Sequence, residues 1–189
     1  MSHRVVLTLW TDEKINEEET RILRTPSIEI PVPFDNERKR DIQTLIDTFL
    51  GRNDGVGLAA PQIGIARRII VFRNKEFDEK SWSKSDRDYD VLINPRITQA
   101  RGDMVTRPEG CLSCPEIQIE ISRFPEIKVR AYDINGQKVS RRYTDYLARI
   151  VQHEMDHLDG KLIIDYDGDL YVPKKRQDFF AAFFGNKES

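Results

Sequence analysis

The chain has 189 residues, with 30 Lys and Arg against 32 Asp and Glu, which gives a formal net charge of −2. Because neither sign of charge dominates, the composition carries no signature of nucleic-acid binding and no polybasic membrane anchor. The N-terminus lacks the apolar run of a secretory signal, and no stretch approaches the roughly 18 apolar residues of a membrane span. We therefore expect one folded unit in the cytoplasm, without a membrane or DNA partner.

The first predicted element is a helix over residues 35–50. Its apolar residues recur with the spacing of one helix face: Ile42, Leu45, Ile46 and Phe49. Asp35 suits the N-cap, and Gly51 suits the end of the helix. The glycine-rich stretch that follows leads into a strand-like run over residues 68–72.

Residues 74–90 are polar and charged, which is typical of an exposed loop. The sequence VLINPRI at 91–97 predicts a short strand that ends or bends near Pro95. Apolar residues then alternate over 117–121, as expected for a half-buried strand.

Residues 126–143 carry the strongest hairpin signal in the chain. Alternating segments flank Asn135-Gly136, a pair that favours a tight type I′ turn. A helix is then predicted over 145–159, capped by Thr144 or Asp145 and followed by Gly160. Strands followed by a helix, without βαβ alternation, indicate an α+β fold with mostly antiparallel sheet.

The C-terminal tail predicts a short helix with an aromatic face. Four residues of the tail share that face: Phe179, Phe180, Phe183 and Phe184. We expect this face to pack on the body of the protein. A partner surface or a frayed end are the alternatives.

The 145–159 helix contains the H-E-x-x-H motif His153-Glu154-Met155-Asp156-His157. Residues four apart share a helix face, so both imidazoles can reach one metal ion. Glu154 lies about 100° round the helix from His153, close enough to reach a metal-bound water. Such an ion lowers the pKa of its water to about 7, and a carboxylate can take the proton. The motif predicts a hydrolytic metal site, with a solvated His/Glu face as the alternative.

The residues alone leave the third ligand open. His3, Asp165 and Asp167 are candidates, because the longer zincin pattern with a third His six residues on is absent. Cys111 is the better candidate, since thiolate binds both Zn²⁺ and Fe²⁺ strongly. Adding Cys114 would make a closed structural site, which has no use for a general base. A CxxC redox pair is a further alternative.

The stretch GVGLAAPQ at 55–62 lacks the GK[ST] of a phosphate loop and the spacing of a dinucleotide-binding fingerprint. Its small residues would let a substrate backbone approach closely, and Gln62 could donate to an oxyanion. Taken alone, the stretch is typical of a tight turn that enters a strand.

Three blocks nevertheless occur together and in order: GVGLAAPQ at 55–62, EGCLS at 109–113 and HEMDH at 153–157. Their order and spacing resemble the three signature motifs of the peptide deformylase family, over roughly residues 40–166. The resemblance implies an α+β fold in which antiparallel β-sheets pack around a central metal-binding helix.

The family's domain plan, carried over, implies a single catalytic domain over residues 1–189. The segments 1–34 and 167–189 depart most from the family pattern, so the resemblance says least about them.

The resemblance also implies an activity, the hydrolysis of the N-formyl group from the N-terminal formylmethionine of new peptides. Metal-bound hydroxide would attack the formyl carbon, and formate would leave. Glu154 would act as general base and then as general acid. Cys111, His153 and His157 would hold one divalent ion, Fe²⁺ in the cell, with Zn²⁺ or another divalent metal possible in purified protein.

Substrate contacts follow from the same resemblance. Gln62 and the backbone N–H of Leu112 would stabilise the oxyanion. Val56 and Gly57 would pair with the substrate backbone like an added strand. The methionine pocket would be lined by two residues, Gly110 and Ile150.

Three further residues would support the site: Glu109 and Arg123 as an ion pair under the cysteine loop, and Asp156 beside the metal ligands. Some family members dock on the ribosome through a basic C-terminal helix. The tail cations are therefore expected to make a transient ribosome contact or to form an ordinary solvated face: Lys174, Lys175 and Arg176.

Two competing functions remain from the residues alone. A general H-E-x-x-H metallopeptidase would cleave internal peptide bonds. A non-catalytic metal-binding domain would tolerate Glu154→Gln.

Overall fold

The computed structural model describes residues 3–12, 14–75 and 88–185. It contains two antiparallel sheets, one with strand order β1-β2-β3-β6-β7 and the other with order β4-β5-β8. The strands of the first sheet are β1 (Gly57–Ala59), β2 (Ile69–Arg73), β3 (Tyr89–Arg101), β6 (Glu126–Tyr132) and β7 (Lys138–Thr144). Those of the second are β4 (Val105–Cys111), β5 (Cys114–Arg123) and β8 (Leu170–Tyr171).

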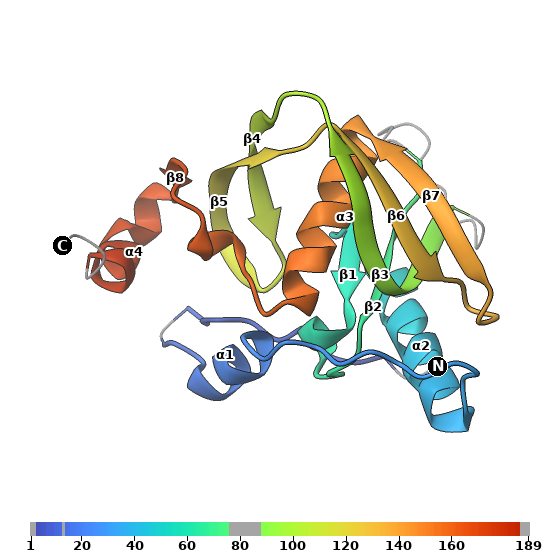
Figure 1. The fold of residues 1–189 in the computed structure, drawn as a ribbon. Helices are drawn as coiled ribbons and strands as arrows, with labels where there is room; N and C mark the ends of the chain where they lie inside the picture. Colours follow the sequence, from blue (N-terminus) through green and yellow to red (C-terminus); the bar gives the residue numbers. More distant parts are fainter. Residues whose placement is uncertain (1–2, 13, 76–87, 186–189) are drawn as a thin grey trace.

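The described helices are α1 (Glu17–Leu23), α2 (Asn36–Leu50), α3 (Asp145–Leu158) and α4 (Gln177–Phe184). The described residues also form three short 3₁₀ turns: η1 (Ala60–Ile63), η2 (Ile163–Asp165) and η3 (Lys174–Arg176). Figure 1 shows α3 between the two sheets, with β4 and β5 on one side and β3, β6 and β7 on the other. The α+β expectation, with antiparallel sheets around the metal-binding helix, is confirmed.

Helix α3 is held in place by its apolar face. Ala148, Val151 and Leu158 are fully buried against the inner faces of the first sheet, which supply Ile127 and Val129 of β6. Burying a Val or Leu side chain contributes about 1.5–3 kcal/mol, so these contacts fix the helix between the sheets. The side of α3 that carries its polar residues is thereby turned toward the second sheet.

The predicted helix over 35–50 is present as α2. The Asp35 side chain accepts a hydrogen bond from the Arg38 backbone N–H, which caps the helix as expected. Its predicted apolar face is buried: Ile42, Leu45, Ile46 and Phe49. The predicted helix over 145–159 is present as α3, with Thr144 at the N-cap position and Gly160 at φ 72° just beyond the end.

The strand predicted over 91–97 is longer than expected. Strand β3 runs from Tyr89 to Arg101 and passes through Pro95. Asn94 takes a φ of 51°, and the register of β3 against β6 shifts between Ile93 and Arg96. The irregularity absorbs the proline, so the strand bends there and continues instead of ending. Most of the predicted loop at 74–90 lies outside the described residues.

The hairpin over 126–143 is present, but the predicted type I′ turn is wrong. A type I′ turn needs positive φ at both central residues, and only Gly136 has it, at 77°. The Asp133 carboxylate instead accepts hydrogen bonds from the N–H groups of Asn135 and Gln137. This side-chain bonding organises a longer loop between β6 and β7.

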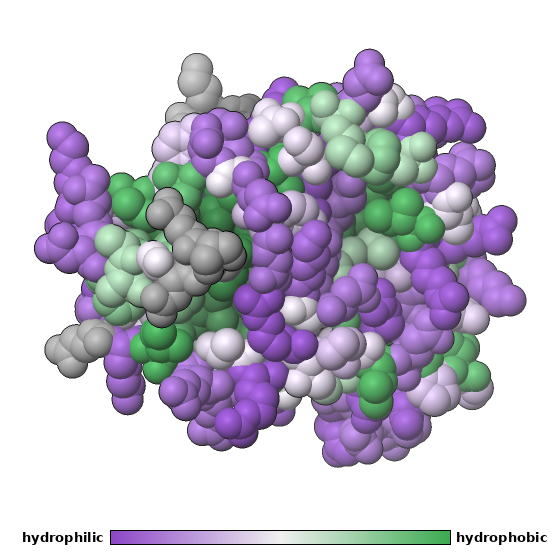
Figure 2. Space-filling model, turned by 60° about the vertical axis from the view of Figure 1, so that its left-hand side comes forward, coloured by the Kyte–Doolittle hydropathy of each residue, from purple (hydrophilic) through white to green (hydrophobic). Residues whose placement is uncertain are grey.

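The C-terminal helix α4 packs on the N-terminal segment. The rings of Phe180 and Phe183 meet Trp10 edge to face, at centroid distances of 5.2 and 5.0 Å. Phe180 is buried, as expected for the aromatic face of this helix. Figure 2 shows hydrophobic residues gathered on the side of the molecule that carries α4, beside hydrophilic ones. None of the described helices is long and apolar enough to cross a membrane.

Candidate active site

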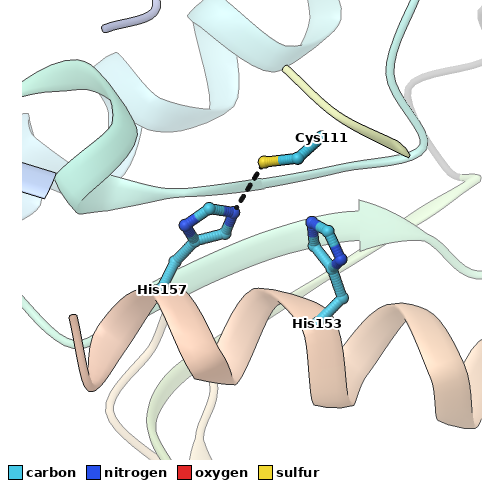
Figure 3. A group of neighbouring side chains, drawn as sticks. All are labelled: Cys111, His153 and His157. Carbon is cyan, nitrogen blue, oxygen red and sulfur yellow. Dashed lines mark hydrogen bonds between the residues drawn. The ribbon is translucent and has the colours of Figure 1, made fainter. Parts of the chain in front are cut away.

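Helix α3 and the β4–β5 hairpin bring three ligand-type side chains together. His153 and His157 lie one turn apart on α3, and Cys111 ends β4 where the hairpin turns. One ligand atom from each lies within 4.8 Å of the others, and Cys111 Sγ lies 3.2 Å from His157 Nε2. Figure 3 shows the three side chains pointing toward one another from opposite sides.

This donor set fits a divalent metal ion. Zinc lies about 2.0–2.3 Å from N and S ligands, so its ligand atoms must lie within roughly 4–5 Å of one another, as they do here. The other candidates from the sequence are excluded from the group. Asp165 pairs with Arg24, and neither His3 nor Asp167 belongs to any such cluster in the described part of the chain.

Cys114 lies next to the ligand group without being part of it. Its thiol forms a hydrogen bond with the Cys111 sulfur, and this contact lowers the pKa of Cys111 well below its usual range. Burial raises the pKa of Cys114 itself. The pair is therefore asymmetric, with Cys111 suited to bind as a thiolate and Cys114 suited to remain a thiol.

A buried ionic network fixes the orientation of His153. The Nδ1 atom of His153 lies 3.0 Å from Glu109 Oε2, which leaves Nε2 free to face Cys111. Arg123 binds the same carboxylate through two hydrogen bonds of 3.0 and 2.9 Å. Arg123 also contacts Asp156 at 2.6 Å, and the Tyr166 hydroxyl bonds to both. Glu109, Arg123 and Asp156 thus form one network.

The charged residues of this network alter one another's pKa values. Burial alone would raise the pKa of Glu109, but hydrogen bonds from His153 and Arg123 outweigh it and lower that pKa to about 2. Both partners are almost fully buried, with 5–6 % of each side chain exposed. Breaking such a pair leaves a buried charge uncompensated, so each member depends on the others.

Arg149 belongs to this network and was not singled out from the sequence. Its guanidinium donates to Glu109 at 2.6 Å and to the Ile121 carbonyl at 2.8 Å, and it also binds the Val105 carbonyl. It therefore ties α3 to both strands of the cysteine hairpin. The signal was available, because Arg149 precedes His153 by four residues and must share its helix face.

Glu154 is buried beside the ligand group. Its Oε2 atom has no hydrogen-bond partner among the described residues, although only 4 % of the residue is exposed. Burial raises the pKa of Glu154 to about 7. A carboxylate that is buried and has an oxygen without a hydrogen-bond partner is suited to exchange a proton with a reacting group.

Glycine is required beside Glu154. A Cβ atom built on Gly57 would lie 2.3 Å from Glu154 Oε1, so any other residue there would force the Glu154 carboxylate to move. A Cβ on Gly110 would meet nothing closer than 3.8 Å. The backbone of β1 therefore closes over the carboxylate at Gly57.

The side-chain amide of Gln62 is fixed by hydrogen bonds at both its oxygen and its nitrogen. Its Oε1 accepts from the Ala59 backbone N–H at 2.9 Å. Its Nε2 donates to Ser113 Oγ at 3.1 Å and points toward Cys111 Sγ at 3.9 Å. The amide N–H thus faces the ligand group, where a donor could meet a developing negative charge.

These residues line one cavity of about 940 Å³, which lies near the upper end for ligand sites and has room for several peptide residues. The predicted residues that reach it are Val56, Gly57, Gln62, Glu109, Gly110, Cys111, Leu112, Ile150, His153 and Glu154. Three other predicted residues do not line it: His157, which belongs to the ligand group, and Arg123 and Asp156, which belong to the ionic network. Tyr146 and Arg149 also line it and were not predicted.

Residues 13–171 match the family model described as Polypeptide deformylase. A peptide deformylase of Rickettsia prowazekii is 42 % identical over 131 residues, which cover 69 % of this chain and 74 % of the relative. One from Thermotoga neapolitana is 42 % identical over 132 residues, covering 70 % and 73 %.

Solved structures of peptide deformylases are also similar to this chain. A peptide deformylase of Thermotoga maritima superposes with a TM-score of 0.70 at 34 % identity, covering 89 % of this chain and 100 % of that one. A Met-Ala-Ser-bound deformylase of Acinetobacter baumannii gives 0.68 at 29 % identity, covering 86 % and 99 %.

Proposed function

The chain belongs to the polypeptide deformylase family, and from this premise we propose which of its residues perform the family's reaction. That reaction is the metal-dependent removal of the N-formyl group from newly made peptides. The observation that carries the assignment is the joint position of the ligand group and Glu154. The donor atoms of Cys111, His153 and His157 lie within 4.8 Å of one another, beside the unpaired Glu154 carboxylate.

Cys111, His153 and His157 hold one divalent ion. When bound, such an ion lowers the pKa of a coordinated water and polarises a carbonyl oxygen. We assign Fe²⁺ as the ion in the cell. Zn²⁺ or another divalent metal also fits the thiolate and imidazole donors, so purified protein can carry either.

Glu154 moves the proton. Its buried carboxylate, with a pKa of about 7, takes a proton from the attacking water and passes it to the departing amine. The Gln62 side-chain N–H and the Leu112 backbone N–H stabilise the negative charge that develops on the formyl oxygen. Formate and a free methionine N-terminus are the products.

The substrate lies along the free edge of β1. Val56 and Gly57 pair with its backbone, because β1 is an edge strand of its sheet and lines the cavity. Gly110 and Ile150 line the pocket for the methionine side chain. Glu109, Arg123 and Asp156 hold His153 and the cysteine strand in position through the buried ion pairs.

Residues 1–189 act as one catalytic domain in the cytoplasm, where new formylated peptides arise. The tail offers a ribosome contact through Lys174 and Lys175, which are exposed, although Lys175 Nζ also lies 3.4 Å from Glu116 Oε1. Arg176 is less available for this contact. It binds the carbonyls of Thr11 and Asp12 and pairs with Glu116.

Cobalt titration tests the ligand assignment with a matched pair of variants. Cys111→Ser should abolish the cobalt–thiolate absorption band in the near ultraviolet and the release of formate. Cys114→Ser, at the neighbouring thiol, should keep both the band and the activity. A band that survives in Cys111→Ser, or disappears only in Cys114→Ser, would contradict the assignment.

A further inference from the structure

The outer face of the first sheet is strongly basic. Strand pairing places Arg96 of β3 opposite Arg130 of β6, and Lys128 of β6 opposite Arg142 of β7. Residues paired directly across strands share a face, and successive outward residues alternate along β6. Six exposed cations therefore share this face: Arg96, Arg101, Lys128, Arg130, Lys138 and Arg142.

We call these six residues the basic face. The opposite side of the same strands is buried, with Ile127 and Val129 packed in the cluster that contains α3. The charge is thus confined to the outer side. It is unusual for this chain, whose formal net charge is −2, because six cations gather there while acidic residues predominate elsewhere.

Few carboxylates neutralise this face. Glu29 pairs with Arg96 at 2.5 Å, and Glu126 pairs loosely with Arg101 and Arg142 at 3.9 and 3.6 Å. These are exposed pairs, with 72 % of the Arg96 side chain accessible, so a stronger anion can displace them.

The remaining cations of the basic face are free of such pairs. Lys128, Arg130 and Lys138 form no ion pair with another described residue.

A concavity lies at one end of the basic face. It encloses about 700 Å³ and is lined by three of the six cations, one carboxylate, and further polar and apolar residues. The charged residues of this lining are Arg96, Arg130, Lys138 and Glu29, and Ser140 and Tyr132 add hydroxyl groups. With three cations against one carboxylate, the lining carries a net positive charge, which favours a bound anion. Hydroxyl side chains add neutral donors to phosphate oxygens.

The basic face is separate from the catalytic cavity. None of its six residues lines the 940 Å³ cavity that holds the ligand group. Figure 1 shows β6 and β7 on the side of the molecule away from α4 and the C-terminal tail. A large partner can therefore cover the basic face while a peptide still enters the cavity.

We propose that this sheet face docks on the phosphate backbone of RNA, and so holds the enzyme beside the ribosomes that supply its formylated substrates. Charge complementarity selects the partner, because phosphates recur along RNA at a density that several neighbouring cations can meet at once. Binding is independent of base sequence, as expected for contacts to phosphate and ribose. The location differs from the tail contact, whose Arg176 is already occupied by protein groups.

The test measures binding of the metal-loaded enzyme to a labelled 16-base-pair RNA duplex by fluorescence anisotropy at several salt concentrations. The face variant carries Lys128→Glu, Arg130→Glu and Lys138→Glu. The matched tail variant carries Lys174→Glu and Lys175→Glu. Formate release from a free formyl peptide should stay at the wild-type rate in both variants, which shows that each is folded.

The face variant should bind RNA at least about tenfold more weakly at about 50 mM salt than wild type does. The slope of log affinity against log salt should become shallower by about one for each cation removed. The tail variant should change either quantity much less. A milder variant with Gln at the same three positions should lie between wild type and the face variant.

Three results would overturn the proposal: no RNA binding by wild type, equal binding by wild type and face variant, or loss of binding only in the tail variant. Binding to vesicles that contain phosphatidylserine is measured as well. Tighter binding to these vesicles than to RNA, with the same dependence on Lys128, Arg130 and Lys138, would assign the face to a membrane surface and also overturn it.

Discussion

Helices α3 and α4 are held to the rest of the molecule by different forces. Eight of the 14 residues of α3 are buried, and its polar side is tied to the cysteine hairpin by the Arg149–Glu109 ion pair and the His153–Glu109 hydrogen bond. Only one of the eight residues of α4 is buried, Phe180, and aromatic contacts with Trp10 hold it. Besides its apolar packing on the first sheet, α3 thus makes a polar, buried and interdependent contact with the hairpin, whereas the contact of α4 is apolar and local.

This difference indicates that the residues around α3 serve catalysis and that α4 only supports the fold. The charged groups of the ionic network beside α3 each have a specific partner, so a change at one of them leaves another buried charge without compensation. The contacts of α4 are apolar and act over a short segment, so their loss loosens that segment alone. We therefore expect substitutions around α3 to affect catalysis, metal binding and pH dependence, and substitutions in α4 to affect none of these strongly.

The pH dependence of stability should give the largest effect. The pKa of Glu109 is about 2 in the folded protein and about 4.3 in an unfolded chain. Because the folded value is lower, its contribution is complete above pH 4.3 and is lost as the pH falls toward 2. The metal-free wild type should lose up to about 3 kcal/mol of unfolding free energy over this window.

Urea unfolding at a series of pH values measures that loss. Glu109→Gln cannot titrate, so the difference between the wild-type and variant curves isolates the contribution of this carboxyl. Parallel curves for the two proteins between pH 4.3 and 2 would show that the Glu109 carboxylate does not stabilise the fold in the way described.

Gly57→Ala should lower kcat/KM by about 100-fold. The added methyl group would lie 2.3 Å from Glu154 Oε1, so the carboxylate must move from the position where it exchanges a proton. Steady-state formate release measures the effect. Gly110→Ala is the comparison, since its methyl group meets only ordinary contacts at 3.8 Å. Because Gly110 lines the proposed methionine pocket, this variant should change KM and leave kcat near the wild-type value. Equal losses of kcat in the two variants would mean that the fit of Gly57 against Glu154 is unimportant.

Arg149→Met should weaken metal binding by about tenfold, because groups that orient a ligand typically affect affinity by 10–100-fold. The side chain keeps its length but no longer ties α3 to Glu109 and Ile121. Competition with a chelator measures the affinity of the variant. Arg142→Met, on the exposed outer sheet face, is the control and should bind metal like the wild type. Unchanged affinity in Arg149→Met would make this arginine a structural residue only.

Phe180→Ala should have the smallest effect on catalysis, with kcat/KM within about threefold of wild type. Loss of the ring against Trp10 should release α4, which hydrogen exchange would detect as faster exchange in residues 177–184. Protection of α3 should stay the same. A large loss of activity, or faster exchange in α3, would show that the two helices are coupled after all.

Local sequence patterns predicted the parts of the molecule that depend on local spacing. The H-E-x-x-H motif placed both imidazoles on one helix face, and the apolar period of 35–50 placed α2. Thiolate chemistry favoured Cys111 as the third ligand, and the resemblance to a known family then supported it, although its approach to α3 joins residues 42 or more positions apart. The type I′ turn was wrong because the Asp133 side chain, three residues before Gly136, bonds the loop in another way.

Other features depend on pairing between distant strands. Local spacing places Arg149 on the helix face of His153, but its partner Glu109 lies 40 residues away, and no local pattern reveals that contact. The basic face is hidden in the composition, because a net charge of −2 averages over the whole chain. Only the register of β3, β6 and β7 places Arg96, Arg130 and Lys138 side by side. Composition therefore indicates the total charge but says nothing of where strand pairing places it.

Formate release from formyl-Met-Ala-Ser by the Fe²⁺-loaded enzyme, prepared without air, tests the central claim most directly. Glu154→Gln should bind the same amount of metal, since Glu154 is not among the ligand residues. Its rate should nevertheless fall by about 10²–10⁴-fold, the usual contribution of a positioned acid–base group. A fully metallated Glu154→Gln variant that releases formate at the wild-type rate would contradict the account.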